Sequence, residues 1–150
     1  MMMLDSFKIE RVLELPPQLD VLIKYSQSEN FRFLNKLKQD FQAGENCFDQ
    51  HGEALFAVYT PKDQLIAVAG LNQDPFHHSG QVGRLRRFYI HPDYRRQGVG
   101  AYLLQYIEQY AQTYFHELHL FTDTANAASF YQKMGYEPVD LPNTNFRKIF

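Results

Sequence analysis

The chain has 150 residues, a hydrophobic content of 45% and a formal net charge of −2. This length predicts a single domain over residues 1–150, and the near balance of charges gives no general attraction to nucleic acid or to an anionic membrane. The lone cysteine, Cys47, cannot form an internal disulfide. Charged residues interrupt any apolar signal sequence at the N-terminus. A cytoplasmic protein that binds neither nucleic acid nor membrane is therefore expected.

The first third of the chain predicts one strand and two helices. An edge strand is expected over residues 7–13, where apolar and charged residues alternate. Pro16 and Pro17 stop this strand and can open a helix, and apolar residues at helical spacing follow over residues 19–23. A second helix is predicted over residues 32–41, because its apolar side chains fall on one face.

The middle of the chain predicts three strands. Residues 54–60 and 65–71 are expected to form a hairpin around a short polar turn. A polar loop should cover residues 72–80, and a third strand should cover residues 82–90. Pro92 prevents this strand from continuing.

The last third predicts two helices and three strands. The longest helix is expected over residues 98–114, followed by a strand over 118–122 and a helix over 125–134. Residues 136–141 and 146–150 should pair as a closing hairpin. Because strands and helices are mixed along the chain, the sequence predicts a layered α/β or α+β fold.

The clearest chemical motif is Arg95-Arg96-Gln97-Gly98-Val99-Gly100-Ala101, which lies between a predicted strand and the longest helix. Glycines let an anion approach the backbone, and a helix N-terminus offers unpaired N–H groups and partial positive charge. The motif lacks the Gly-Lys-Ser/Thr ending of a P-loop and the third glycine of a dinucleotide fingerprint. A flexible turn that only starts a helix is the alternative interpretation.

The segment from Phe88 to Gly100 resembles the acetyl-CoA motif of the GNAT superfamily of N-acetyltransferases, with Arg95, Gly98 and Gly100 at the motif positions. A second signature of that superfamily is matched by Ala127, Phe130, Tyr131, Lys133, Gly135 and Tyr136. The resemblance extends over residues 7–150. It implies a GNAT-like fold with a central mixed, mostly antiparallel sheet, splayed middle strands and about four flanking helices.

The resemblance also implies acetyl-CoA as the acyl donor, with no metal. The loop before the longest helix would hold the pyrophosphate, and the strand before it would pair with the pantetheine arm. The cofactor-binding residues implied in this way are Phe88, Tyr89, Ile90, Arg95, Arg96, Gln97, Gly98, Val99, Gly100, Ala101 and Asn126.

The reaction implied is direct attack of a primary amine, on a small molecule or a protein, upon the thioester. Tyr131 would protonate the departing thiolate. Arg84 stands where many relatives have a glutamate, and a guanidinium cannot act as a base. His78 is predicted as the base because histidine titrates near neutral pH. The other candidates are a water chain, Glu53, Asp74, His77 and His119.

Three arginines on the central strand allow two interpretations. Alternation places Arg84 and Arg86 on one face with Phe88 and Ile90, and Arg87 on the other face. One or two of them would line an acceptor pocket and favour an acidic acceptor. Alternatively, they would form salt bridges across the sheet.

Two further functions are considered beside catalysis. A non-catalytic acyl-CoA-binding or regulatory module is favoured by the missing glutamate. A phosphate-ligand or RNA-binding domain is disfavoured by the near-neutral charge. Because relatives in the superfamily often pair through their terminal strands, the resemblance also raises the prospect of a homodimer.

Overall fold

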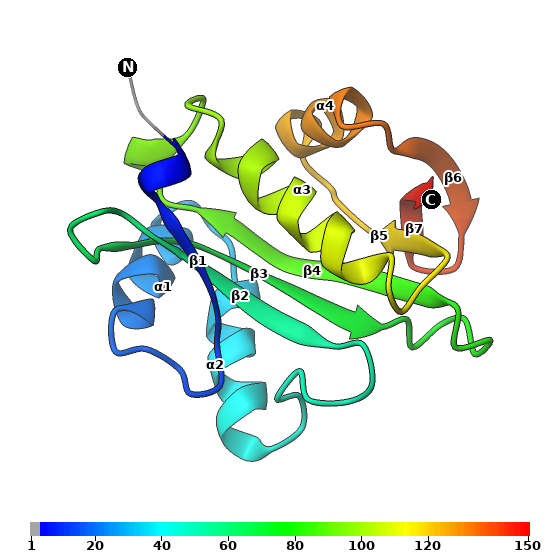
Figure 1. Cartoon of the computed structure of the whole chain (residues 1–150), viewed down its shortest axis with the longest axis horizontal. Helices are drawn as coiled ribbons and strands as arrows, with labels where there is room; N and C mark the ends of the chain where they lie inside the picture. Colours follow the sequence, from blue (N-terminus) through cyan, green and yellow to red (C-terminus); the bar gives the residue numbers. More distant parts are fainter. Residues whose placement is uncertain (1–3) are drawn as a thin grey trace.

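A computed structural model describes residues 4–150 of the chain (Figure 1). Seven strands form one sheet in the order β1-β2-β3-β4-β5-β7-β6. The strands are β1 (Lys8–Arg11), β2 (Ala54–Tyr59), β3 (Leu65–Gln73), β4 (Val82–Ile90), β5 (Glu117–Leu120), β6 (Glu137–Leu141) and β7 (Thr144–Ile149). The α-helices are α1 (Leu19–Ser28), α2 (Phe33–Ala43), α3 (Val99–Ala111) and α4 (Ala125–Lys133).

The sheet is antiparallel except at its centre, where β4 and β5 run parallel. The connection from β4 to β5 contains α3, as a crossover between parallel strands requires. Within residues 4–150 the four helices and the mostly antiparallel mixed sheet confirm the predicted fold class.

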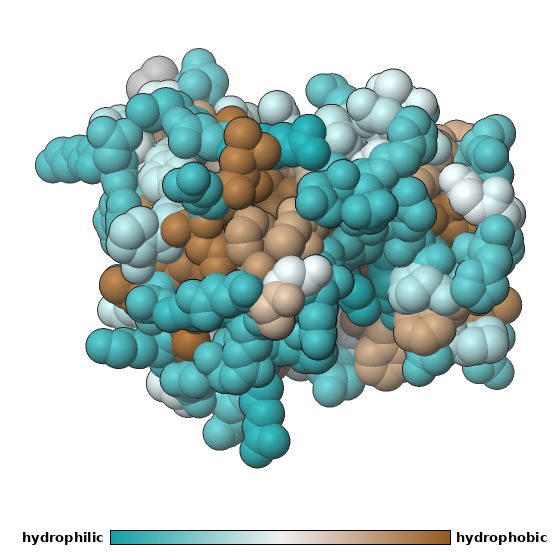
Figure 2. Space-filling model, turned by 90° about the horizontal axis from the view of Figure 1, so that it is seen from below, coloured by the Kyte–Doolittle hydropathy of each residue, from teal (hydrophilic) through white to brown (hydrophobic). Residues whose placement is uncertain are grey.

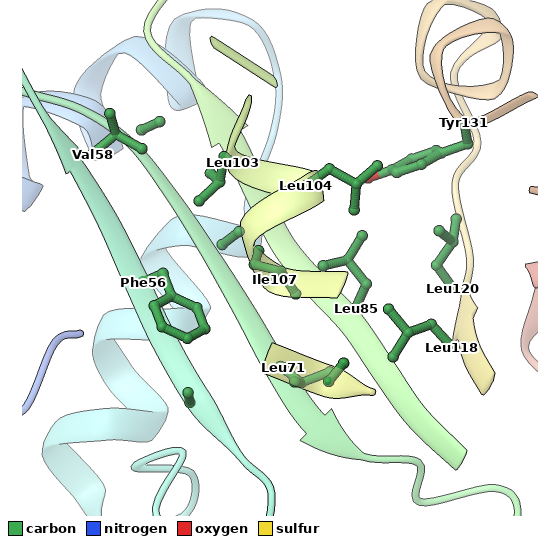
Figure 3. Close-up of a cluster of buried hydrophobic side chains, with 14 of the residues drawn as sticks. Phe56, Val58, Leu71, Leu85, Leu103, Leu104, Ile107, Leu118, Leu120 and Tyr131 are labelled. Carbon is green, nitrogen blue, oxygen red and sulfur yellow. The ribbon is translucent and has the colours of Figure 1, made fainter. Parts of the chain in front are cut away.

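The helices cover both faces of the sheet. One hydrophobic cluster packs α3 and Tyr131 of α4 against one face, and a second cluster packs α1 and α2 against the other. Figure 1 shows α3 in front of the sheet and α1 and α2 behind it. The buried apolar residues of α3 are Val99, Leu103, Leu104, Ile107 and Ala111. Figure 3 shows Leu103, Leu104 and Ile107 among the buried side chains between α3 and the sheet.

Several element boundaries differ from the sequence-based prediction. β3 continues through Asn72 to Gln73, two residues into the predicted loop, because the Asp74 N–H still donates to the Val82 carbonyl. β7 begins at Thr144, inside the predicted turn. β1 is confined to Lys8–Arg11, although Phe7 and Val12 beside it are buried as expected.

The molecular surface is mainly polar. Figure 2 shows hydrophilic residues over most of one face, with an exposed apolar area among them. Every helix within residues 4–150 is too short or too polar to cross a lipid bilayer.

Candidate active site

β4 and β5 separate along their length and open the middle of the sheet. Their parallel pairing covers only residues 82–84 of β4 and 117–119 of β5. β4 continues to Ile90, whereas β5 ends at Leu120. Among residues 4–150, the second half of β4 therefore has no strand paired on that side. This separation is the splay of the middle strands that the family resemblance implied.

A β-bulge at Arg87 lies at the start of the opened part of β4. The register with β3 pairs Gly70 with Arg86 and Val68 with Tyr89, so one residue of β3 stands opposite two residues of β4. Arg87 takes up the extra residue with a φ of +59°.

The bulge changes which side chains share a face. Leu85, Phe88 and Ile90 pack with the cluster under α3, and Tyr89 packs with the cluster under α1 and α2. Arg86 alternates with Leu85 and so lies on the α2 face. The prediction that Arg84 and Arg86 share a face with Phe88 and Ile90 is therefore wrong, because strict alternation ends at the bulge.

The backbone amides of Phe88 and Ile90 are directed at the open side of β4. The His91 N–H donates to the Ile66 carbonyl at 2.7 Å, and Tyr89 opposes Val68 in the same ladder. Backbone polar groups alternate between the two neighbours of a strand. The groups of Phe88 and Ile90 therefore point to the side that β5 has left. An extended ligand fits such an edge as an added strand.

The turn between β4 and α3 presents a row of backbone N–H groups. Arg96 and Gly98 have left-handed backbones, with φ values of +60° and +87°, and Gly98 is the N-cap of α3. Among the amides of residues 97–102, that of Tyr102 reaches a backbone acceptor, the Gly98 carbonyl at 3.0 Å. The amides before it are the free donors of a helix start, and together with the helix dipole they attract an anion.

Gly100 and Val99 fix this helix start against the opened strand. A Cβ atom on Gly100 would lie 3.3 Å from the Phe130 ring and 3.8 Å from the Phe88 ring. The missing side chain therefore lets α3 approach both rings. Val99 is buried, so its side chain anchors the helix start in the core.

The side chain of Arg95 is engaged within the protein. Its terminal nitrogens donate to the two carboxylate oxygens of Glu29 at 2.6 and 2.7 Å, and its Nε donates to the Ile90 carbonyl at 3.1 Å. The Tyr89 hydroxyl also donates to Glu29. No local pattern in the sequence pointed to Glu29, which lies at the C-cap of α1, 66 residues before Arg95.

The other cofactor candidates at this end are exposed. Arg96 and Gln97 lie on the surface of the turn, and Gln97 Nε2 donates to the Asp93 carbonyl at 2.9 Å. Asn126 is exposed in the first turn of α4, whose N-cap Thr124 accepts the Ala127 N–H at 3.2 Å. Asn126 therefore stands at a second helix N-terminus.

Tyr131 extends from α4 into the core beside the opened strand. Its ring lies 6.2 Å from that of Phe88 and 5.6 Å from that of Tyr136, centre to centre. Figure 3 shows the side chain directed toward Leu104 of α3. Burial raises the pKa of Tyr131, so the hydroxyl keeps its proton at neutral pH. A proton donor to a thiolate requires this state.

Arg84 is held in a buried polar cluster. Its Nη1 lies 3.5 Å from Asp74 Oδ1 and donates to Thr144 Oγ1 at 3.1 Å, and its Nη2 donates to the Asn143 carbonyl. His119 lies between two carboxylates, with Nδ1 3.2 Å from Asp74 and Nε2 3.0 Å from Glu117. Arg84 therefore ties β4 to the loop after β3 and to the β6–β7 turn.

His78 is exposed in the loop that precedes β4. A strand rises about 3.3 Å per residue, so roughly 20 Å of β4 separates residue 82 from Phe88. The fold therefore does not bring His78 together with Tyr131. His77 pairs with Ser79 at 3.1 Å in the same loop, and Glu53 accepts the backbone N–H of Gln73 at 3.0 Å.

Residues 19–136 match the family model described as the acetyltransferase (GNAT) family. A solved structure from Exiguobacterium sp. 255-15, which carries a provisional acetyltransferase name, is 25% identical with a TM-score of 0.85, over 95% of this chain and 93% of that chain. No curated protein sequence matches this chain.

Two further structures share the fold at lower identity. An acetyltransferase from Streptococcus agalactiae is 18% identical with a TM-score of 0.77, over 97% of this chain and 99% of that chain. An acetyltransferase from Elizabethkingia anophelis, solved with acetyl-CoA bound, is 16% identical with a TM-score of 0.63, over 91% of this chain and 79% of that chain.

Proposed function

Because the chain belongs to the acetyltransferase (GNAT) family, we propose that it is an N-acetyltransferase that transfers the acetyl group of acetyl-CoA to a primary amine. The pyrophosphate of the donor binds the backbone amides of residues 97–101 at the start of α3. The pantetheine arm pairs with the open edge of β4 through Phe88 and Ile90. Arg96 and Asn126 lie where their side chains contact the cofactor from the solvent side.

The main support for this proposal is that the open edge of β4, Tyr131 and the start of α3 all meet at Phe88. Its backbone belongs to the open edge of β4, and its ring packs against both Tyr131 and the start of α3 at Gly100. An extended cofactor with its pyrophosphate at α3 and its arm along β4 has its thioester on this part of the strand. A strand edge, an anion site and a proton donor thus meet where the transfer requires them.

The chemistry needs no covalent enzyme intermediate. The neutral amine attacks the thioester carbon, a C–N bond forms, and a strand N–H stabilises the negative oxygen. The C–S bond then breaks, and Tyr131 gives a proton to the thiolate. The attacking nitrogen releases its proton to water, and a proton from water restores the Tyr131 hydroxyl. The products are an N-acetylated amine and free CoA, and holding both reactants together supplies much of the rate.

The side chain of Arg95 has a supporting role in this proposal. Its ion pair with Glu29 and its bond to the Ile90 carbonyl hold the turn against α1 and β4. Backbone amides are therefore the principal ligands of the pyrophosphate, and Arg95 fixes their orientation.

The second candidate function is a module that binds acyl-CoA without turnover. The specific observation in its favour is Arg84, which occupies the position of the usual glutamate and is fully committed to structural contacts. Both candidates predict cofactor binding. They differ in the release of free thiol in the presence of an amine.

The decisive experiment combines binding with turnover. A ligand at about 100 times its Kd stabilises the native state by roughly 2.7 kcal/mol, so acetyl-CoA should raise the Tm while ATP and NAD should not. Thiol release from acetyl-CoA is then followed with a panel of amines. Binding with amine-dependent thiol release supports the transferase, and binding without release for any amine supports the module. Absence of a Tm shift with every CoA thioester would overturn both.

A further inference from the structure

A polar cavity of about 390 Å³ lies on the α2 face of β4, against Arg86 and the bulge residue Arg87. Its walls come from α2, the loop after α2, the end of β3 and β4. The cations that line it are Lys36, Arg86 and Arg87, and the carboxylates in its walls are Asp40, Glu45, Asp49 and Glu53.

Arg86 is a half-buried cation in this cavity without a direct partner. Within residues 4–150 its guanidinium makes no hydrogen bond or ion pair, and the charges that act on it from a distance are those of Asp40, Asp74 and Glu53. Burial lowers the pKa of Arg86, which shows that its charged form is poorly solvated. Such a cation gains more from an incoming anion than a solvated one does.

Arg87 is also only loosely compensated. Its Nη2 lies 3.9 Å from Asp40 Oδ2, and the same carboxylate lies 3.4 Å from Lys36 Nζ. One acidic group thus serves two cations, and Arg86 has none in direct contact. By contrast, Arg84 and Arg95 on either side along the chain are saturated by protein acceptors.

The cavity and the proposed transfer site lie on opposite faces of the same part of β4. The donor site proposed above lies at the start of α3, and the cavity lies on the opposite face, toward α2. Arg86 and Arg87 directly precede Phe88 on β4. An acceptor held in the cavity therefore approaches the opened strand from the face that the donor leaves free.

From these contacts we propose that this cavity is the acceptor subsite and that Arg86, helped by Arg87, binds a carboxylate on the acceptor, so that the substrate is a small amine bearing a carboxylate. A guanidinium presents a planar fork of donors that matches a carboxylate. This inference rests on the proposed function and deepens it, because it names the class of acceptor.

The test compares amino acids with their carboxamides, which keep the amine and the shape but lose the negative charge. Thiol release from acetyl-CoA is measured for wild type, Arg86→Gln and Arg86→Lys, with Arg147→Gln, at a partly exposed position on β7, as a control. Wild type should prefer the acids. Arg86→Gln should raise KM for them by roughly tenfold to hundredfold, leave the carboxamides unchanged, and be partly rescued in Arg86→Lys.

A binding measurement separates failure of this inference from failure of the proposed function. Glutarate, a dicarboxylate without an amine, is titrated calorimetrically into the wild type and the Arg86→Gln variant. Binding that Arg86→Gln removes supports the anion subsite even if no amine is acetylated. Equal KM values for amino acids and their carboxamides, or no glutarate binding to the wild type, would overturn the inference. The proposed transferase activity is tested separately, by acetyl-CoA binding and amine-dependent thiol release.

Discussion

The carboxylate of Glu29, at the end of α1, accepts hydrogen bonds from both terminal nitrogens of Arg95, at 2.6 and 2.7 Å. It also accepts a hydrogen bond from the Tyr89 hydroxyl. This contact joins the loop after α1 to the turn before α3. The turn supplies the proposed pyrophosphate amides, so the ion pair holds the anion site in place from the opposite side of the sheet.

Replacing Glu29 with glutamine should destabilise the protein in a pH-dependent way. Hydrogen bonding from Arg95 lowers the pKa of Glu29 in the folded state. The stabilisation is therefore present above the unfolded pKa of about 4.3 and is lost as pH falls through the lowered folded pKa. At pH 7 the cost should be about 1 kcal/mol, since the pair is partly exposed.

Thermal unfolding from pH 3 to pH 7 measures this effect. The difference between wild type and Glu29→Gln should shrink toward zero at the acidic end. Glu14→Gln, at an exposed position, serves as the control. A difference of the same size at pH 3 and pH 7 would show that the carboxylate charge contributes nothing.

Removing the Tyr131 hydroxyl should slow chemistry without weakening donor binding. Tyr131→Phe keeps the ring contacts with Phe88 and Tyr136. A positioned acid typically contributes about 10²- to 10⁴-fold, so kcat should fall by roughly that factor. Because burial raises the pKa of Tyr131, the wild-type rate should show no loss from tyrosine ionisation up to about pH 9.

The comparison variant for Tyr131 is Tyr110→Phe, because Tyr110 lies on α3 and its hydroxyl contacts the Glu53 carbonyl at 3.4 Å. Its kcat should stay near that of wild type. Equal kcat values for Tyr131→Phe and wild type, at saturating acetyl-CoA, would remove Tyr131 from the proton transfer.

Gly98→Ala should raise the Kd for acetyl-CoA, and this rise should exceed that of a variant that loses the same amount of folding stability elsewhere. Gly98 has a φ of +87°, and a Cβ atom there would lie 3.0 Å from Leu4 Cδ1. The substitution strains the turn that directs the amides of residues 97–101 at the anion. Isothermal titration with acetyl-CoA measures the change.

Gly44→Ala is the matched control, since Gly44 has a φ of +77° with open space around it at the C-cap of α2. Both variants should lose about 1 kcal/mol of stability from backbone strain. Only Gly98→Ala should raise the Kd for acetyl-CoA. A parallel rise in Gly44→Ala would assign the effect to general loss of stability.

Arg84→Met should be strongly destabilising. Arg84 is 5% exposed and its guanidinium faces the buried Asp74, so its removal leaves that carboxylate with His119 alone as a charged partner. Breaking a buried pair in this way costs about 3–5 kcal/mol. Arg147→Met removes a partly exposed pair with Glu137 and should cost no more than about 1 kcal/mol. Urea unfolding of both variants checks the contrast, and similar costs would contradict it.

The sequence by itself determined the fold class and the position of the glycine-containing turn that is proposed to bind the pyrophosphate. Helical spacing of apolar residues such as Leu103 and Ile107 placed α3, and Gly98 and Gly100 marked its start, because these signals are local in the chain. The separation of β4 and β5 was also predicted, although from a resemblance and not from residue patterns.

Tertiary structure alone decided which side chains meet. The bulge at Arg87 moved Arg86 to the face opposite Phe88, since one extra residue inverts strand alternation. Glu29 reached Arg95 from 66 residues away, and His78 was left at the far end of β4. Such contacts depend on how elements pack across a sheet, and no local spacing in the chain encodes them.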